Sequence, residues 1–496
     1  MTVLAYCRPY SVRPGDEVAI HVSAPGGTAT IEIVRDGAAE ERVWRDAAVR
    51  VTEHEVPADA PEAGCRWPAT ATVGIGDDWR SGCYLVRVTP AGADAPAPPS
   101  GFFVVRARRP SSDGMLLVLA TNTWNAYNDV GGRNYYTGSV VASFARPLGL
   151  GMLAKPDGDG ARVATLVPGT LAQAYVSGVR RHGLSVWHGM AGWATWERLF
   201  ATWAERAGYV VDVATNADLE RVAALLDGYR LILSVGHDEY WSADMRDAVE
   251  SFVAAGGNAA FFSGNTCYWQ VRLEGEAQVC FKHRFREDPV FGTDRARLTT
   301  TIWSDPILGR PETRLTGVSF TRGGYSRVAT SVPHASGGYI VHRPELWPFA
   351  GTGVRYGDVL GARDVVVGYE CDGCELAMVD GRPVPTGRDG CPTSFEVLAT
   401  APATPFDAAT TPLPLAPGGE YELEFHADRL LGDRSPPALE RLRYGHAVLG
   451  TYTCGGTVFT TGCTDWVHGL GDPAVERVTR NVLDRLGRDR VVGSTP

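Results

Sequence analysis

Side chains that could bind a metal ion or move a proton follow directly after an apolar run at residues 231–235. The run ends at Gly236, and His237 and Glu239 lie in the turn that comes before a helical pattern starting at Ser242. A strand, a turn and a helix in this order place both side chains at the carboxyl edge of a parallel sheet. Open α/β sheets hold their active sites at that edge.

A second strand end carries side chains of the same character. An apolar strand expected at residues 115–121 runs into a turn that contains Tyr127, and the doubled tyrosine Tyr135 and Tyr136 follows. Phenolate and carboxylate oxygens are hard, anionic donors that favour a highly charged cation such as Fe³⁺ over zinc. The ordinary pKa of tyrosine is about 10, so a bound cation must drive the deprotonation. The two strand ends therefore predict a site for a hard metal ion or a polar substrate.

Length and charge limit the classes of protein that the chain can belong to. The chain has 496 residues and a formal net charge of −10, which disfavours nucleic acid or an anionic membrane as its main partner. That length predicts two to four domains. We expect no transmembrane helix, because no apolar run approaches about 18 residues. No signal peptide is visible at the start, so we expect a cytoplasmic protein.

The pattern of apolar residues, polar residues and turns along the sequence predicts an α/β protein. Apolar and polar positions alternate between turns over residues 1–108, which predicts an immunoglobulin-like β-sandwich. Strands and helices alternate over 109–300, which indicates a mostly parallel α/β catalytic core. Residues 301–440 read as a β-rich insertion, and 441–496 return to strand and helix and complete the core. The core elements expected are strands at 115–121, 209–215, 230–236, 258–263 and 456–462, and helices at 217–226, 243–255 and 473–486.

Ten cysteines over this length do not indicate a disulfide scaffold, and in a cytoplasmic chain most should be reduced and many should be buried. The densest group is Cys371, Cys374 and Cys391. A zinc site would need a fourth ligand at matching spacing, and none is obvious. We therefore do not expect zinc here.

Six short motifs form a recognisable set: Thr123-Trp-Asn-Ala-Tyr-Asn, Gly131-Gly-Arg-Asn-Tyr-Tyr, Gly236-His-Asp-Glu-Tyr-Trp, Gly256-Gly-Asn, Ser263-Gly-Asn and Gly462-Cys-Thr-Asp-Trp. In these motifs the chain resembles the large (β) subunit of N,N-dimethylformamidase and its relatives, over roughly residues 114–490. The resemblance implies a core related to class I glutamine amidotransferases and a mononuclear ferric ion bound by two tyrosines and one glutamate. It also implies hydrolysis of an amide, although resemblance transfers fold better than substrate.

Carried over position by position, the metal ligands that the resemblance implies are Tyr127, Tyr136 and Glu239. The second ligand falls on the doubled tyrosine, where we choose Tyr136 over Tyr135. Three protein ligands leave positions open for water and for a carbonyl oxygen. A bound ion then polarises the carbonyl and lowers the pKa of water.

The resemblance implies four further catalytic residues: His237, Asn265, Lys282 and Glu370. The nitrogen of an amide leaves only when it is protonated, so a general acid is needed, and His237 could serve as that acid or as the base for water. The expected substrate is a small amide such as an N-substituted formamide. The sequence leaves open whether the chain forms a homo-oligomer or pairs with a smaller subunit, as the dimethylformamide enzyme does.

Each of these residues also has a structural interpretation. Tyrosines after strands are commonly packing residues with a satisfied hydroxyl. Asp238 and Glu239 before a helix can be N-capping residues favoured by the helix dipole, although Ser242 could cap that helix instead.

Two other functions stay open. Cys267 follows a strand and could be the nucleophile of an amidohydrolase, with His188, His283 or His468 as its base, although the glycines of a sharp nucleophile elbow are absent. The chain could also be a non-catalytic protein that binds sugars or other small molecules. Four tryptophans near strand ends would suit such a surface, and they equally suit an apolar amide pocket: Trp124, Trp241, Trp269 and Trp466.

Overall fold

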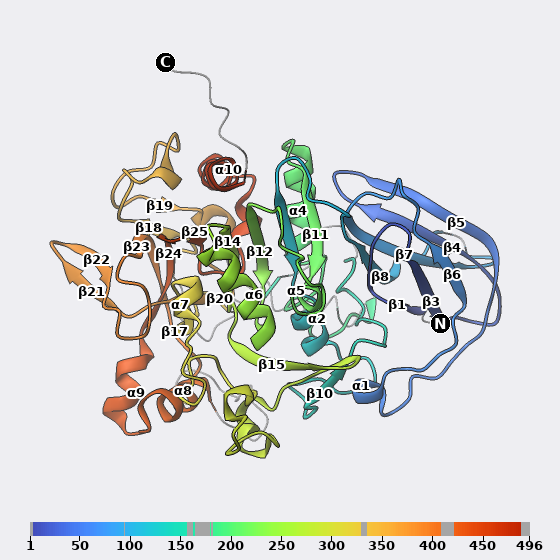
Figure 1. The fold of residues 1–496 in the computed structure, drawn as a ribbon, viewed down its shortest axis with the longest axis horizontal. Helices are drawn as coiled ribbons and strands as arrows, with labels where there is room; N and C mark the ends of the chain where they lie inside the picture. Colours follow the sequence, from blue (N-terminus) through green and yellow to red (C-terminus); the bar gives the residue numbers. More distant parts are fainter. Residues whose placement is uncertain are drawn as a thin grey trace.

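The computed structural model describes residues 3–93, 95–155, 162–163, 179, 182–328, 335–407 and 421–487. It is an α/β protein with many strands, as the sequence predicts. An N-terminal β-rich part, a central sheet with helices, and a C-terminal part lie side by side in Figure 1. None of the helices within these described ranges is both long and apolar enough to span a membrane.

The N-terminal part consists of two sheets that share one core. The three-stranded sheet contains, in order, β1 (Leu4–Arg8), β3 (Glu17–Ser23) and β6 (Ala71–Gly74). The five-stranded sheet contains β2 (Ser11–Val12), β8 (Pro99–Val105), β7 (Gly82–Pro90), β4 (Gly27–Asp36) and β5 (Glu40–Val51). Alternate residues such as Ile31 and Ile33 in β4 and Val86 and Val88 in β7 are buried together. This alternation of buried residues is the period of two expected of strands with one face in a core.

A nine-stranded sheet forms the centre of the molecule. Its order is β11 (Val211–Thr215), β9 (Met115–Leu119), β12 (Leu231–His237), β14 (Asn258–Gly264), β25 (Gly456–Thr460), β24 (Gly445–Cys454), β23 (Glu396–Ala403), β18 (Tyr339–Val341) and β19 (Val359–Leu360). The first five strands run parallel to one another, and each later strand is antiparallel to its neighbour. Strand β25 therefore joins the C-terminal segment to β14, and three strands of the 301–440 segment extend the same sheet.

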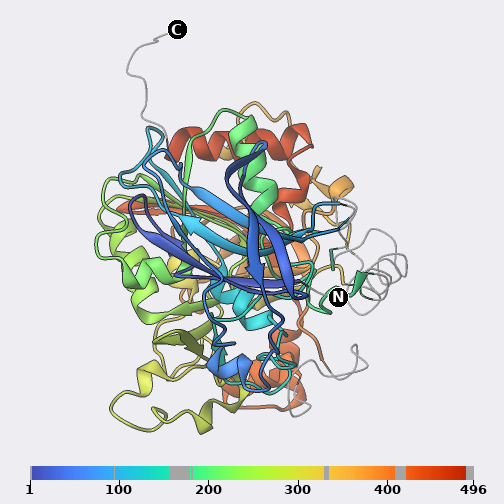
Figure 2. The same ribbon diagram turned by 90° about the vertical axis from the view of Figure 1, so that its right-hand side faces the viewer.

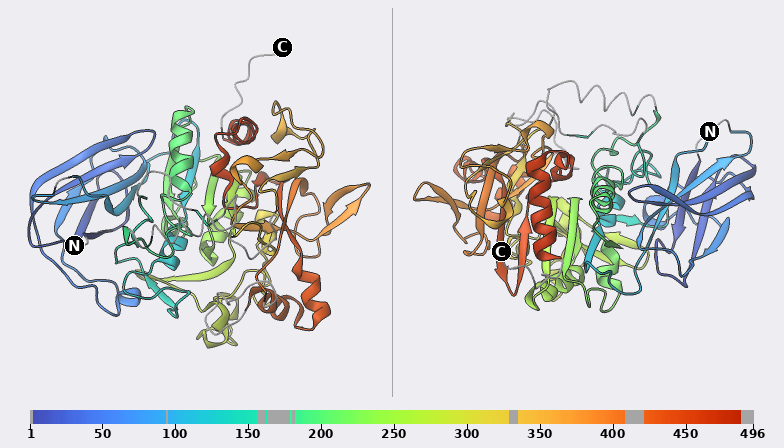
Figure 3. Two further views of the ribbon diagram at one scale, coloured as in Figure 1. Left: turned by 180° about the vertical axis from the view of Figure 1, so that it is seen from behind. Right: turned by 90° about the horizontal axis from the view of Figure 1, so that it is seen from above.

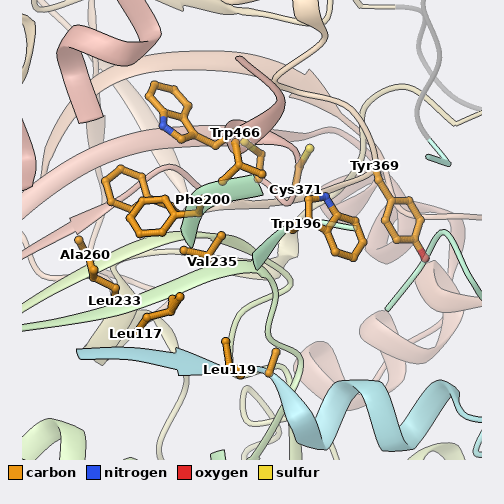
Figure 4. Close-up of a cluster of buried hydrophobic side chains, with 14 of the residues drawn as sticks. Leu117, Leu119, Trp196, Phe200, Leu233, Val235, Ala260, Tyr369, Cys371 and Trp466 are labelled. Carbon is orange, nitrogen blue, oxygen red and sulfur yellow. The ribbon is translucent and has the colours of Figure 1, made fainter. Parts of the chain in front are cut away.

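Helices cover both faces of the parallel half. Leu117 and Leu233 face helices α4 (Glu197–Arg206) and α10 (Pro473–Leu486), which lie on one side of the sheet (Figures 2 and 3). Figure 4 shows Leu117, Leu233 and Ala260 in the cluster on this side, together with Phe200 of α4. Their sequence neighbours Leu116 and Ile232 face helices α5 (Asn216–Arg221) and α6 (Ala243–Ala254) on the other side.

Helix α10 shows how sequence produces this packing. Its N-cap Asp472 accepts hydrogen bonds from the amides of Ala474 and Val475, and Pro473 occupies the first turn, where its missing N–H costs nothing. A run of apolar residues at helical spacing is buried against the sheet: Val475, Val478, Val482, Leu483 and Leu486. Each fully buried aliphatic side chain contributes roughly 1.5–3 kcal/mol, which fixes the helix to the core.

The remaining elements are smaller sheets and short helices. A four-stranded sheet contains β10 (Val141–Ser143), β16 (Ala277–Val279), β15 (Trp269–Glu274) and β13 (Tyr240–Ser242). Two strand pairs are β17 (Ser319–Tyr325) with β20 (Glu370–Gly373), and β21 (Leu376–Val379) with β22 (Arg382–Pro385). The other helices are α1 (Ala60–Ala63), α2 (Thr121–Tyr127), α7 (Thr313–Thr316), α8 (Glu422–Leu431) and α9 (Pro436–Arg443). The 3₁₀ helices are η1 (Lys282–Glu287), η2 (Ala296–Leu298), η3 (Trp347–Phe349), η4 (Ala362–Asp364) and η5 (Trp466–Gly469).

Candidate active site

The side chains predicted to form the site come from seven places along the chain. Tyr127 is the last residue of α2, Tyr136 follows in the next loop, His237 ends β12 and Glu239 precedes β13; Asn265 follows β14, Lys282 opens η1 and Glu370 opens β20. Tyr136 is partly buried, and the other six are buried. Hydrogen bonds and close contacts connect these side chains into one cluster: Tyr127, Tyr136, Glu239, His237, Glu370, Asn265 and Lys282.

The segment around Tyr127 is a helix and not the turn that its sequence indicates. Asparagine side chains usually compete with helical hydrogen bonds by bonding to nearby backbone. Here Asn122 donates to the carbonyl of Tyr240 and Asn125 donates to the carbonyl of Ala142, so both amides are occupied by other segments. The buried Trp124 fixes the helix to the core. Tertiary contacts therefore override the turn preference of the local sequence.

The oxygens of three side chains from separate segments converge on one point. The Tyr136 hydroxyl lies 2.5 Å from the Tyr127 hydroxyl and 3.1 Å from each carboxylate oxygen of Glu239. The neighbouring Tyr135 points elsewhere and donates to the carbonyl of Gln278 at 2.8 Å. Tyr136, and not Tyr135, therefore belongs to this oxygen cluster.

His237 connects this cluster to a second carboxylate. Its Nε2 lies 2.7 Å from Glu370 and 3.2 Å from Glu239, and its Nδ1 lies 2.7 Å from the carbonyl oxygen of Met190. Burial opposes a positive charge on the ring, but Glu370 and Glu239 outweigh burial, and the pKa of His237 is raised well above its ordinary value. Burial also raises the pKa of Glu370, against the opposing effect of His237. One proton held between these two side chains satisfies both.

Lys282 and Tyr240 form the other side of the cluster. The Lys282 ammonium lies 3.1 Å from the Tyr240 hydroxyl and 3.5 Å from the centre of the Tyr136 ring. The Tyr240 hydroxyl in turn lies 3.0 Å from that of Tyr136. Burial alone would raise the pKa of Glu239, but hydrogen bonding to His237 and the charge of Lys282 lower it, so Glu239 is an anion. Burial lowers the pKa of Lys282, against the opposing effect of Glu239.

Tyr240 lies in the Gly236-His-Asp-Glu-Tyr-Trp motif, but the sequence alone assigns it no role. Its position directly after Glu239 is the signal that points to it. Strand β13 turns the Tyr240 side chain back toward Tyr136, a contact that no spacing rule predicts.

Asn265 is held in an unusual backbone conformation by a buried carboxylate. Its φ is +51°, in the left-handed region, and Asp372 accepts hydrogen bonds from the amides of Asn265 (2.9 Å) and Thr266 (3.0 Å). The Asn265 side chain also hydrogen-bonds to Glu370. Its Oδ1 has no partner among the described residues, which leaves a buried acceptor for a ligand. A Cβ at the preceding Gly264 would lie 2.6 Å from the backbone oxygen of Glu370, so only glycine lets these strands approach.

The oxygen cluster suits a hard cation by the chemistry of its donors. No group of three or more His, Cys, Asp or Glu able to hold a metal occurs in the part of the chain that the structure describes, so tyrosine oxygens would have to contribute. Burial and then Glu239 raise the pKa values of Tyr127 and Tyr136 well above 10. Two phenolates at neutral pH would therefore need a cation beside them. These residues fit a ferric ion and do not fit a thiolate-bound metal.

The capping interpretation of Glu239 does not match this geometry. Ser242 is the N-cap of α6 and accepts from the amide of Met245. Glu239 instead contacts Tyr136 and His237.

The geometry around Cys267 opposes its use as a nucleophile. It is fully buried in the cluster on the α6 side of the sheet, and burial raises the pKa of its thiol far above the ordinary value. A thiolate there is strongly disfavoured. The three histidines considered as its base lie in other surroundings: His188 beside the carbonyl of Ser185, His283 against Phe425, and His468 beside Asp465.

The tryptophans do not form a binding surface. Trp124, Trp241, Trp269 and Trp466 are each at most 2% exposed. Only Trp269 approaches the candidate site, where the Lys282 ammonium lies 5.0 Å from its ring centre. The interpretation of these four side chains as a sugar-binding surface is therefore wrong.

Comparison with known proteins identifies the family. A sequence profile described as N,N-dimethylformamidase beta subunit-like, C-terminal, matches residues 30–480. The chain belongs to this N,N-dimethylformamidase beta subunit-like family. The N,N-dimethylformamidase beta subunits of Alcaligenes sp. and Paracoccus aminophilus are 27% and 26% identical to it over 308 residues. Each match covers 58% of this chain and 36% of the relative, so the chain matches about a third of the length of these curated relatives.

Similarity to solved structures adds nothing to this assignment. A crystal structure of CHIR-AB1 matches 21% of the chain with 11% identity and a TM-score of 0.15. The dimethylformamidase family therefore rests on the sequence matches alone.

Proposed function

We propose that this protein is a hydrolase that cleaves the C–N bond of a small amide, of the N-substituted formamide type. The observation that carries the proposal is the convergence of Tyr127, Tyr136 and Glu239 beside the His237–Glu370 pair. Membership of the N,N-dimethylformamidase beta subunit-like family supports the choice of an amide.

We propose Tyr127, Tyr136 and Glu239 as the residues that hold a mononuclear ferric ion. When bound, such an ion supplies Lewis acidity to a carbonyl oxygen and to water. The protein contributes two phenol oxygens and one carboxylate in a buried site, and Lys282 places a positive charge over the ring of Tyr136. That charge offsets part of the negative charge that the three side chains would carry.

His237 is the proton carrier in this proposal. The carbonyl of Met190 can only accept, so Nδ1 of His237 donates to it and Nε2 is left to hold the mobile proton beside Glu370. A substituted amide nitrogen must be protonated before it leaves as an amine, and Nε2 can deliver that proton. Glu370 then shares the replacement proton with the ring.

In this proposal Asn265 positions the substrate, and Lys282 places a positive charge beside the oxygen cluster. The Asn265 side chain hydrogen-bonds to Glu370, and its buried Oδ1 has no partner among the described residues. An acceptor there suits an N–H or O–H of substrate or water. Lys282, hydrogen-bonded to Tyr240, holds its ammonium where negative charge gathers.

We also propose wider relationships that follow from the family. The five parallel strands with helices on both faces are compatible with a core related to class I glutamine amidotransferases, and the paired N-terminal sheets with an immunoglobulin-like module. The relatives are named beta subunits, so we propose a partner subunit, and we propose a cytoplasmic location for the protein. Light scattering of the purified chain, alone and co-expressed with neighbouring gene products, distinguishes that partner from a homo-oligomer.

The test of the proposal is amine release from a series of N-alkyl formamides and acetamides. We expect turnover of the small substituted formamides, and loss of it in Glu370→Gln with the fold intact. Alkylation of cysteines should leave turnover unchanged, because Cys267 is buried. Full activity of Glu370→Gln, or inactivation by alkylation at Cys267, would contradict the proposal.

A further inference from the structure

Two cysteines flank a projecting hairpin that follows strand β20. Cys374 and Cys391 enclose residues 375–390, which contain strands β21 and β22, and this hairpin stands out from the body of the molecule in Figure 1. Asp389 joins the two ends of the segment. Its carboxylate accepts from the amide of Glu375 at 2.6 Å and from the amide of Cys391 at 3.2 Å. The backbone next to one cysteine is thereby held beside the other.

The two thiols meet at this neck. Cys374 and Cys391 share a hydrogen bond, and their side chains belong to the same buried cluster as Phe395 and Tyr452. The Cys391 thiol also lies 3.7 Å from the carbonyl of Pro392. Cys374 is 4% exposed and Cys391 is 2% exposed, so both thiols are buried and an oxidant reaches them only when the neck opens.

The third member of the cysteine group faces the other way. Cys371 lies in the cluster on the α10 side, where it forms a β-bridge with Cys463. Cys371 is therefore in a different buried cluster from Cys374 and Cys391, and the three cannot form one zinc site. Cys374 and Cys391 are therefore a pair of thiols in contact, and Cys371 does not join them to bind a metal.

We propose that Cys374 and Cys391 form a redox-sensitive disulfide that closes the 375–390 segment, with a low-molecular-weight disulfide such as oxidised glutathione as the oxidant. One cysteine sulfur attacks the oxidant, whose S–S bond breaks and releases one thiol. The second cysteine sulfur then displaces the other oxidant sulfur from this mixed disulfide. Two S–H bonds are lost and one S–S bond forms, while the oxidant takes up two electrons and two protons as two thiols.

Access for the oxidant comes from the hairpin. Met378 and Val379 are 68% and 51% exposed, and Glu375 and Gly390 at the neck are partly exposed. A projecting two-stranded hairpin opens locally at low free-energy cost. The pair Cys371 and Cys463, at 0% exposure each, meets at a β-bridge within the core and requires a much larger opening.

Peptide mapping of the full-length protein tests the proposal. The protein is incubated with oxidised glutathione or with dithiothreitol, alkylated, and digested with trypsin without reduction. Arg388 is exposed, lies between the two cysteines and is followed by Asp389, so trypsin separates the peptides that contain them. We expect one linked peptide pair, two hydrogen masses below the sum of its parts, with fragmentation placing the bond at Cys374 and Cys391.

Variants provide the matched control. Cys374→Ser should abolish the linked pair, and Cys454→Ser, at the exposed cysteine, should leave it unchanged. Limited trypsin digestion of the folded oxidised protein should give fragments that separate only on a reducing gel. The proposal is overturned if the wild-type protein links Cys371 to Cys463 instead, or if all ten thiols are alkylated after oxidation. Because the wild-type map decides this, a Cys374→Ser variant that fails to fold leaves the test intact.

Discussion

The Nδ1 atom of His237 lies 2.7 Å from the carbonyl oxygen of Met190, which determines where the proton of this ring can move. A carbonyl oxygen cannot donate, so Nδ1 carries a hydrogen. Nε2 then faces Glu370 and Glu239 as the one nitrogen of the ring that can gain or lose a proton. The ring is therefore oriented as a proton carrier next to the proposed metal ligands and is not itself in the oxygen cluster.

Substitutions at His237 and Glu239 should have different effects. Glu239→Gln keeps the shape but removes a negative charge from the proposed ligands, so iron binding should fall sharply. His237→Ala removes only the proton carrier, so iron should stay while turnover drops by about 10²–10⁴-fold. Elemental analysis and amine release measure the two effects on the same samples.

Thermal melts control for misfolding, because both substitutions lie on one turn. The assignment of roles is wrong if a folded His237→Ala variant loses iron while Glu239→Gln keeps it. It is equally wrong if neither change alters amide hydrolysis.

The doubled tyrosine offers a matched pair of substitutions. Tyr136→Phe removes an oxygen from the cluster and should abolish iron binding and turnover. Tyr135→Phe loses a buried hydrogen bond to the carbonyl of Gln278, which costs about 0.5–1.5 kcal/mol of stability, and it should keep both. Iron content and urea unfolding of the two variants check this. Loss of iron from Tyr135→Phe alone would transfer the ligand role to that residue.

Some of the fold follows directly from local sequence. The helix expected at 473–486 has those bounds in the structure, because Asp472 caps it and its apolar residues repeat at helical spacing. The strand expected at 258–263 is β14, extended by one residue to Gly264. The helix expected at 217–226 ends early, at Arg221. Strand pairing in the 301–440 segment was not predictable, because β18 and β19 have three and two residues and pair with distant strands.

Some of the site residues likewise follow from local sequence, and others do not. The positions of His237 and Glu239 follow from the order of strand, turn and helix. Lys282 and Glu370 came only from the resemblance, since tertiary packing alone brings residues far apart in the sequence to the same cluster. Tyr240 was missed because its role depends on where strand β13 directs its hydroxyl.

Tyr240→Phe should tune the proposed site without removing a ligand. The change deletes the hydroxyl 3.0 Å from that of Tyr136 and 3.1 Å from the Lys282 ammonium. Iron should remain bound, because Tyr127, Tyr136 and Glu239 are intact. The visible absorption of the ferric protein should shift, because the Tyr136 oxygen loses a hydrogen-bonding neighbour. An unchanged spectrum would mean that Tyr240 does not influence Tyr136.

The free energy of unfolding should decrease in acid, because His426 is buried in its neutral form. Burial, followed by Arg322, lowers the pKa of His426 to about 3, and its Nε2 lies 2.6 Å from the Tyr268 hydroxyl. The unfolded chain, with an ordinary histidine pKa of about 6.5, binds more protons than the folded chain between these values. The free energy of unfolding should therefore be fully present above pH 6.5 and decrease as pH falls toward 3.

His426→Gln isolates this contribution. The amide does not titrate and can still hydrogen-bond to Tyr268, so the loss of stability between pH 6.5 and 5 should be smaller than in the wild type. Urea unfolding at several pH values measures both curves. Identical slopes for the two proteins would show that His426 does not carry the effect.

The most direct test of the proposed site is the iron content and visible spectrum of protein purified without added metal. The account predicts about one iron per chain and, in the ferric form, a visible band from tyrosinate-to-iron charge transfer. Tyr127→Phe should shift or weaken that band, and Tyr135→Phe should leave it unchanged. Iron-free protein with full activity on an N-substituted formamide would contradict the account.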